Sequence, residues 1–374
     1  MKKRCFLFSL AVLWPLSVCT SCKKTNDAEI ALVTDISSLK DGGFNEGTWN
    51  GIQAYAKKNG KTCQYYQPAN GANATDDDRI VAMTLAIENA AKIIVVPGFL
   101  QGKAIRQMAI NHPKVKFVFI DGFILKDDED KELQNVTAIR YKEEEAGYLA
   151  GYSAYAEGYR KLGGTFGGGG SNSSCNRFAY GYVQGINEAA KKSDGPVADV
   201  KISYKYGSSF GASTDLQTQM ASWYQSGIEI IFGCGGSMIH SVVSASNLYP
   251  KAKIIGVDID QSSLSPRVLT SATKNLESSV QVALKDYYAG NWESGLGGKI
   301  CLLGAKEDAV SLPTSEKSWR FTNFKKEQYD EIYRALKEGK IKVVPAFEGQ
   351  DYNQIERWKK ISDECAKVNI DFEF

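Results

Sequence analysis

The chain has 374 residues, and its 45 Lys and Arg nearly balance its 43 Asp and Glu, giving a formal net charge of +2 at pH 7. This length exceeds what one hydrophobic core usually supports, so two lobes are expected. The balanced charge leaves no strongly basic face of the kind that a nucleic-acid-binding protein needs, so no nucleic-acid partner is expected.

The N-terminus has the three parts of a secretory signal. Residues 1–4 carry the basic side chains, residues 5–18 form an apolar run, and small residues precede Cys22. The run is shorter than the roughly 20 residues of a membrane-spanning helix, so a signal peptide over residues 1–21 is predicted. Small residues before a cysteine are typical of a bacterial lipoprotein, which predicts acylation of Cys22 and a membrane tether over residues 22–28. The alternative is an ordinary signal peptide in which Cys22 has no special role.

The remaining cysteines do not form a recognisable metal or disulfide motif. They are widely spaced, odd in number and without a C-x-x-C pair: Cys63, Cys175, Cys234, Cys301 and Cys365. We therefore expect neither a zinc site nor a disulfide framework, and no cofactor.

Strands and helices alternate along the first half of the sequence. Short apolar strands are predicted at Glu29–Thr34, Lys92–Val96 and Val115–Ile120, and Asn45–Lys58 has the apolar spacing of an amphipathic helix. Strands separated by helices are typical of parallel sheets with crossover helices. The predicted fold class is therefore α/β, with Rossmann-like lobes.

The second half of the sequence repeats the first. Residues 112–121 align with residues 249–258, with the proline, two lysines and the final aspartate coinciding, and residues 93–96 fall on 230–233 at the same offset. Further upstream, Phe44, Gly47 and Gly51 match Phe178, Gly181 and Gly185 at nearly that offset. Chance similarity between two βα units is the alternative, but so many matches favour a duplication into two similar halves.

Acidic residues stand at the ends of three predicted strands: Asp35, Asp121 and Asp258. Ligands of open parallel sheets bind beyond the carboxyl ends of the strands. If the two lobes face each other, Asp121 and Asp258 point into one cleft from opposite sides. Gly235, just after a strand of the second half, is also predicted to line this site.

Two aromatic rings and one lysine complete the predicted site. Phe44 lies in a glycine-bearing loop before the first helix, and Phe210 lies in a similar loop of the second half, so the two rings could sandwich a flat base. Asp258 and Asp121 could accept hydrogen bonds from a vicinal diol, with Lys274 as an added donor. The alternatives are structural, with Phe44 or the aspartates acting as caps of neighbouring segments.

Other motifs give little support for catalysis or phosphate binding. Gly163–Gly170 lacks the pattern of a phosphate-binding loop and is predicted to be a strand, Leu162–Phe166, followed by a flexible loop. His112 and His240 have no partner at metal-ligand spacing. The acidic runs are expected to be solvated faces or caps: Asp76–Asp78, Asp127–Asp130 and Glu143–Glu145.

Several motifs together resemble the basic membrane protein family. These are V-T-D at 33–35, D-G-G-F-N-E at 41–46, K-E-E-E-A-G-Y-L-A-G-Y at 142–152, G-V-D-I-D-Q at 256–261 and T-S-A-T-K at 270–274. The best-known members of that family are bacterial surface lipoproteins that serve as purine-nucleoside receptors of ABC importers. The resemblance implies a type I periplasmic-binding fold, a purine-nucleoside ligand, an ABC permease as partner and an extracytoplasmic, lipid-anchored location at the cell membrane.

The resemblance also implies roles for individual residues. The family's stacking rings map to Phe44 and Phe210, and its base-reading polar groups map to Asp35 and Asn45. Its ribose-holding Asp and Lys map to Asp258 and Lys274, with Asp121 as a further assignment. The sequence departs from the family at Gly43, where a small polar residue is common, and at residues 36–38, where glycines are usual.

Three crossovers are expected between the lobes. Lobe 1 is predicted to span 29–140 and about 259–295, and lobe 2 to span about 141–258 and about 296–374. The predicted function is capture of a purine nucleoside without chemistry on it. The alternatives are a sugar receptor of the same fold, a surface lipoprotein acting as adhesin or sensor, and an enzyme, which lacks a recognisable catalytic pair.

Overall fold

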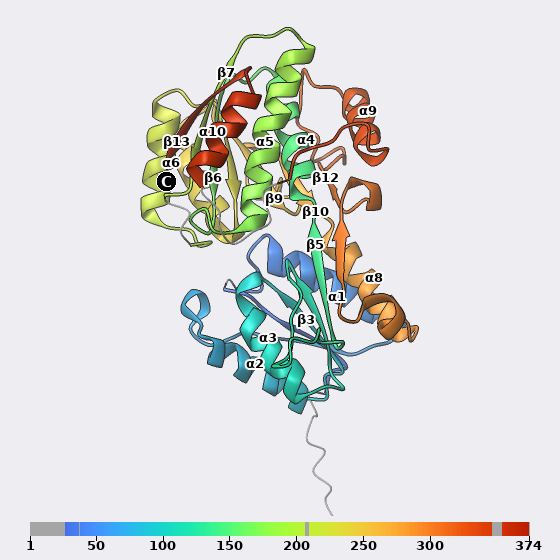
Figure 1. Cartoon of the computed structure of the whole chain (residues 1–374). Coiled ribbons are helices and arrows are strands. Elements are labelled where there is room, and N and C mark those ends of the chain that lie inside the picture. Colours follow the sequence, from blue (N-terminus) through green and yellow to red (C-terminus); the bar gives the residue numbers. More distant parts are fainter. Residues whose placement is uncertain (1–26, 37, 206–208, 346–353, 374) are drawn as a thin grey trace, which may run out of the picture.

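The computed structural model describes residues 27–36, 38–205, 209–345 and 354–373, which form two α/β lobes (Figure 1). Each lobe is built on its own sheet, as predicted, and helices pack against both sheets. Within these ranges, no helix has the length and apolar character needed to cross a membrane. The predicted signal peptide, Cys22 and most of the tether fall outside the described residues.

Lobe 1 is the body that contains the six-stranded sheet, with strand order β11-β5-β4-β3-β1-β2 and parallel pairing throughout. Its strands are β1 (Ile30–Val33), β2 (Cys63–Tyr66), β3 (Ile93–Pro97), β4 (Lys116–Ile120), β5 (Val136–Tyr141) and β11 (Ile300–Leu303). Its helices are α1 (Phe44–Asn59), α2 (Asp76–Glu88), α3 (Gly102–Asn111) and α8 (Leu276–Tyr288). Every residue of β1 and β3 is buried, as expected for strands that helices cover on both faces.

Lobe 2 contains the seven-stranded sheet, with strand order β12-β10-β9-β8-β6-β7-β13. Its strands are β6 (Lys161–Phe166), β7 (Ala198–Ser203), β8 (Ile230–Cys234), β9 (Lys253–Asp258), β10 (Val268–Lys274), β12 (Val310–Ser311) and β13 (Val368–Glu373). Only β12 pairs antiparallel among these described strands. Its helices are α4 (Glu143–Glu157), α5 (Ser173–Lys192), α6 (Thr214–Gln225), α7 (Ile239–Ser246), α9 (Lys326–Lys337) and α10 (Gln354–Glu364).

Short helical turns connect several of these elements. Three of them follow strands at the cleft edge or at a crossing, namely η2 (Phe99–Gln101), η3 (Gly236–Met238) and η5 (Ala305–Glu307). The others are η1 (Gly71–Asn73) and the π-helical turn η4 (Trp292–Leu296).

The chain crosses between the lobes three times, but not all at the predicted positions. The crossings follow β5, β10 and β11, so the first one agrees with the predicted change of lobe near residue 141. Residues 268–274 were assigned to lobe 1, yet β10 pairs with β9 in the lobe 2 sheet. Residues 300–303 were assigned to lobe 2, yet β11 pairs with β5 in the lobe 1 sheet. The strand pattern does not reveal which sheet a late strand joins, because either sheet offers an open edge.

The two central helices of lobe 2, α4 and α5, approach each other through glycines. A Cβ atom at Gly151 would lie 2.0 Å from the carbonyl oxygen of Tyr182, and one at Gly181 would lie 2.0 Å from that of Glu144. Gly147 and Gly185 are as close to the opposite backbone, at 2.2 Å and 2.1 Å. Real Cβ atoms do not occupy such positions, so these glycines set the spacing of the two helices.

Replacing one of these glycines tests the close approach. We expect Gly181→Ala to lower the free energy of unfolding by about 1–3 kcal/mol or more, because the added methyl group must push the two helices apart. The matched control is Gly295→Ala, where a Cβ atom meets nothing within 4 Å. Urea unfolding of both variants measures the difference, and equal stabilities would contradict the glycine-dependent contact.

Candidate functional site

A cavity lies between the lobes, at the carboxyl ends of β1, β3 and β4 of lobe 1 and of β6, β8, β9 and β10 of lobe 2. Its empty space, with the open mouth included, is about 550 Å³. All eight predicted ligand-binding residues line it: Asp35, Phe44, Asn45, Asp121, Phe210, Gly235, Asp258 and Lys274. The structure therefore brings together residues from both halves of the sequence in one place.

Equivalent strand ends of the two halves face this cavity. Asp121 ends β4 and Asp258 ends β9, and both adopt left-handed backbone conformations, with φ of 55° and 66°. Gly98 and Gly235 follow β3 and β8, and both also have positive φ, at 100° and 136°. Aspartate tolerates the left-handed region better than most residues. The backbone turns at the same point in both halves, which directs the two carboxylates into the cavity from opposite lobes.

Asp35 lies directly against the backbone of Gly98. A Cβ atom at residue 98 would be 2.3 Å from the Asp35 carboxyl carbon, so only glycine leaves room for this side chain. Burial raises the pKa of Asp35 to about 7, and the main-chain N–H of Ile36 and the charge of Arg79 only partly oppose that rise. Among the residues that the structure describes, none is a hydrogen-bond partner of its Oδ1 atom. Asp35 therefore presents an unpaired carboxyl oxygen to the cavity.

The loop before α1 is organised by its own side chains. Asp41 is buried and accepts hydrogen bonds from the main-chain N–H groups of Gly43, Asn45 and Glu46, which caps the helix. The Asn45 amide oxygen accepts from the N–H of Asp35, and its amide nitrogen donates to the carbonyl of Ser38. Asn45 thus lines the cavity, and its amide also holds the loop in shape.

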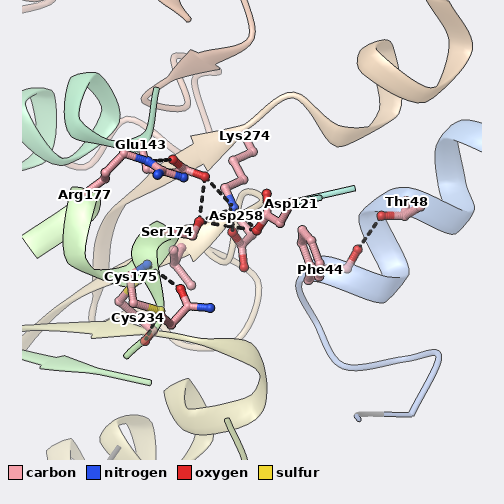
Figure 2. A network of polar contacts seen from close by, with 12 residues as sticks. Phe44, Thr48, Asp121, Glu143, Ser174, Cys175, Arg177, Cys234, Asp258 and Lys274 are labelled. Atoms are coloured by element: carbon pink, nitrogen blue, oxygen red, sulfur yellow. Dashed lines mark hydrogen bonds and ion pairs between the residues drawn. The ribbon is translucent and has the colours of Figure 1, made fainter. Parts of the chain in front are cut away.

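Aromatic rings come from both lobes. Phe44 is the first residue of α1, in lobe 1. Its ring centroid lies 5.1 Å from Nζ of Lys274, which belongs to lobe 2 (Figure 2). Phe210 packs over the backbone of Gly167 and Gly235. It also meets Phe99 of lobe 1 edge to face, with ring centroids 6.4 Å apart. The cavity therefore has rings from lobe 1 and lobe 2 on its walls.

Lys274 is the hub of the polar groups in the cavity. It donates to Asp121 Oδ2 at 2.7 Å, to Ser174 Oγ at 2.9 Å and pairs with Glu143 Oε1 at 3.2 Å (Figure 2). Asp258 Oδ1 is farther away, at 3.7 Å. An ammonium group has three N–H donors, and Lys274 uses two of them in hydrogen bonds to Asp121 and Ser174, with an ion pair to Glu143 in addition. The sequence treated Lys274 as a donor to the ligand, whereas here it is a buried counterion held by protein partners.

Glu143 was assigned to a solvated acidic run, and that expectation is wrong. It is fully buried at the start of α4, and its Oε2 accepts from Arg177 Nε at 2.5 Å. Burial on its own would raise the pKa of Glu143, but the charges of Arg177 and Lys274 and the hydrogen bonds from Arg177 and Ser174 outweigh it and hold the pKa at about 2. The neighbouring Glu144 is also buried, whereas the run at 127–130 is mainly exposed and the run at 76–78 is partly exposed.

The two facing aspartates keep acceptor capacity for a ligand. Asp121 Oδ1 has no hydrogen-bond partner in the described part of the chain, although Oδ2 accepts from Lys274. Burial raises the pKa of Asp258 to about 7, against the opposing charge of Lys274, with Asp121, Asp41 and Glu143 adding to the rise. Burial also raises the pKa of Asp121, again opposed by Lys274. A ligand hydroxyl group that donates a hydrogen bond to these carboxylates would replace part of the hydration that they lose on burial.

Several lining residues were not predicted. They are Ile36, Asp41, Gly98, Phe99, Asn172, Ser174, Cys175, Phe178, Cys234, Gly236 and Val257. One usable signal was the repeat, which aligns Phe178 with Phe44 and places Gly98 one repeat before Gly235. The proximity of Ser174 has no signal in the sequence. Among the residues that the structure describes, there is no group of three or more His, Cys, Asp and Glu side chains that could hold a metal ion, and five cysteines are free thiols.

Comparison with protein families gives a match over residues 28–348, to the family described as PnrA-like substrate-binding proteins of ABC transporters. A similar protein is the ABC transporter nucleoside-binding protein BmpA of Lactococcus lactis subsp. cremoris, 29% identical over 70% of this chain and 75% of that one. Basic membrane protein D of Borreliella burgdorferi is 29% identical over 85% and 88%. A protein named as an uncharacterised lipoprotein in Pyrococcus abyssi is 25% identical over 85% and 79%.

Solved structures of similar fold include solute-binding proteins of ABC systems. That of Aeropyrum pernix K1 has a TM-score of 0.63 at 20% identity over 90% of both chains, and that of Conexibacter woesei has 0.64 at 18% identity over 86% of this chain and 100% of the other. A transcriptional activator of the comK gene from Bacillus halodurans scores 0.63 at 15% identity over 82% and 95%. These likenesses show the fold, which is shared by proteins of different function.

The raised pKa of Asp35 makes a prediction about stability. Because its folded pKa, about 7, lies above the ordinary value of 3.8, the folded state binds the proton more tightly, so ionisation lowers stability as pH rises from about 4 to above 7. Asp35→Asn removes this penalty, and we expect its melting temperature at pH 8 to exceed that of the wild type by about 2 °C or more. The gain should shrink toward pH 4. A gain that does not depend on pH, or a loss at pH 8, would contradict the buried ionisation.

Proposed function

The chain belongs to the family of PnrA-like substrate-binding proteins of ABC transporters, and from that premise we propose that it captures a purine nucleoside between its lobes. Members of this family are solute-binding proteins of ABC transport rather than enzymes, and this chain is one of them. The proposal concerns the identity of the solute and the way in which the cavity holds it.

One observation carries the proposal: rings and acceptor-rich carboxylates line the same cavity from opposite lobes. A purine is flat and apolar on its faces, so Phe44 of lobe 1 and Phe210 of lobe 2 can stack on it, at roughly 1–3 kcal/mol per ring–base contact. A ribose carries adjacent hydroxyl groups, which Asp258 and the free Oδ1 of Asp121 can accept. A single molecule that has both a base and a ribose would contact both the aromatic rings and the carboxylates.

The electrostatics favour a neutral ligand over an anionic one. Four carboxyl groups line the cavity, those of Asp35, Asp41, Asp121 and Asp258, and Lys274 is the one basic residue in the described lining. A phosphate group would meet these carboxylates without an unpaired cation in the described lining, because the charge of Lys274 is already paired with Asp121 and Glu143. A nucleoside carries no such charge. The L. lactis relative is named as a nucleoside-binding protein, which supports the same solute class.

We further propose that the protein works at the outer face of the cell membrane and delivers its ligand to an ABC permease. The support is the signal-like N-terminus with Cys22 as the acylated residue, together with the lipoprotein name of the P. abyssi relative. Closure of the lobes around the ligand would be a shift of population toward the bound form.

A thermal-shift panel tests the solute class. Adenosine, guanosine, inosine, the free bases and ribose are each added to the purified mature protein. A ligand at about 100 times its dissociation constant adds roughly 2.7 kcal/mol to stability, so we expect nucleosides to raise the melting temperature while free bases and ribose do not. A response to ribose alone would favour a sugar receptor. No response to any compound would contradict small-molecule capture and favour an adhesin or sensor.

Removal of the Asp258 carboxylate tests the ribose contact. We expect Asp258→Ala to weaken nucleoside affinity at pH 8 by roughly 10-fold to 100-fold, because hydrogen bonds to a charged acceptor contribute about 1.5–3 kcal/mol. The matched control is Asp260→Ala, two residues along, whose carboxylate bonds Ser262 and Ser318 outside the cavity lining. Isothermal titration calorimetry measures both, and equal affinities would remove Asp258 from the binding site.

A further inference from the structure

We propose that Glu143 is a positioning residue for the nucleoside cavity: it holds Lys274 against lobe 2, so that Lys274 reaches Asp121 of lobe 1 and leaves the ligand-facing carboxylate oxygens free. Glu143 is not part of the cavity lining and would act through Lys274. This inference rests on the proposed function, since the cavity it serves is the one assigned to a nucleoside.

The contacts of Glu143 divide between its two carboxylate oxygens. Oε1 faces the cavity side, where it accepts from Ser174 Oγ at 2.6 Å and pairs with Lys274 Nζ at 3.2 Å. Oε2 faces away from the cavity, toward Arg177 on α5 (Figure 2). Arg177 is itself 5% exposed. Arg177 therefore holds Glu143 on the side away from the cavity, and Glu143 in turn holds Lys274 on the cavity side.

Lys274 needs such a support because a lysine side chain is long and flexible, with about 2 kcal/mol of rotamer entropy when it is free. Its ammonium group is buried, with a side-chain exposure of 2%. Glu143 and Ser174 are both in lobe 2 and hold it from one side, and Asp121 receives it on the other. The resulting chain of contacts, from Arg177 to Asp121, spans the junction between the lobes.

The arrangement also has an electrostatic consequence for Asp258. The charged groups that face Asp258 are Lys274 from β10, Asp121 from β4, Asp41 from the loop before α1 and Glu143 from α4. The negative charge of Glu143 raises the pKa of Asp258 and also that of Asp121, whereas Lys274 lowers both. Without the negative charge of Glu143, the pKa of Asp258 would fall.

A purely structural role for the Glu143–Arg177 pair gives a different result. Loss of a buried anchor would lower the melting temperature and the fraction of active protein, but the molecules that stay folded would bind with wild-type affinity. A positioning role weakens binding by the folded molecules at a pH where Asp258 is fully ionised. The affinity of the folded fraction at that pH therefore separates the two roles, whereas the midpoint of Asp258 reports the loss of the Glu143 charge.

The experiment compares Glu143→Gln with the wild type in two measurements. Binding of inosine and adenosine is titrated between pH 5 and pH 9, and the Asp258 carboxyl is titrated by carbon-13 NMR in ligand-free protein, with Asp258→Asn for assignment. We expect the variant to bind roughly 5-fold to 10-fold more weakly at pH 8, because a looser Lys274 leaves the acceptors less preorganised. We expect both midpoints to move to lower pH by roughly half a unit or more.

The matched control is Glu145→Gln, the same change on the same helix. Glu145 pairs with Lys142 and accepts from the N–H of Ala305, without contact to Lys274, so its variant should keep the wild-type midpoint. If Glu143→Gln does not fold, the double variant Glu143→Gln/Arg177→Gln leaves no unpaired buried cation behind, and the same downward shift is expected. Wild-type affinity in the Glu143 variant, or a midpoint that stays or rises, would overturn the proposal.

The two proposals can fail separately. If neither nucleoside binds the wild type, the proposed function fails, while the NMR titration of ligand-free protein still tests whether the charge of Glu143 acts on Asp258. If nucleosides bind the wild type and Glu143→Gln with equal affinity, the positioning role fails and the nucleoside assignment stands.

Discussion

The ion pair between Lys274 and Asp121 is the contact on which the site depends, because it joins the two lobes at the floor of the cavity. The ammonium and carboxylate groups are 2.7 Å apart, at the end of β10 in lobe 2 and of β4 in lobe 1. A buried charge is costly unless it is paired and hydrogen-bonded. Lys274 meets that condition through Asp121, Ser174 and Glu143, and in turn it compensates the carboxylates that face the ligand space.

The duplication supplies a symmetric scaffold, and the ion pair breaks the symmetry. Equivalent residues turn the backbone in both lobes, as the positive φ of Asp121 and Asp258 shows. The strand register, however, pairs Ile120 with Ile139 and Val257 with Ala272, which makes Tyr141 the counterpart of Lys274. One half thus provides an aromatic ring where the other provides a cation, and the Tyr141 ring lies 5.3 Å from that cation. A ligand in the cavity would face an aspartate from each lobe, Asp121 and Asp258, but a lysine from lobe 2 only, Lys274, among the described lining residues.

Much of the fold could be read from the sequence because its elements follow local rules. The α1 boundaries at Phe44 and Asn59 lie within one residue of the predicted helix Asn45–Lys58, and Gly60 ends α1 in the left-handed conformation that a glycine at this position favours. The assignment of residues 268–274 and 300–303 to the wrong lobes was not a local error. Strand pairing is decided by which sheet edge the chain reaches after a crossing, and that depends on the packing of helices such as α8 against α1.

The sequence by itself determined part of the cavity lining. Strand ends of a parallel α/β fold converge at one edge and the repeat identifies the equivalent ends, whereas Phe44, Phe210 and Asn45 were predicted from their loops and from the family resemblance. All eight predicted residues line the cavity, beside others that were not predicted. Only the tertiary structure determined the ionisation and the ion pairs of the charged residues at the cavity. Glu143 reads as part of a solvated run, yet it is buried beside Arg177 and Lys274, which lie 34 and 131 positions further along the chain. Ionisation depends on burial and on the nearest charges in space, and those distances come from packing that no local pattern encodes.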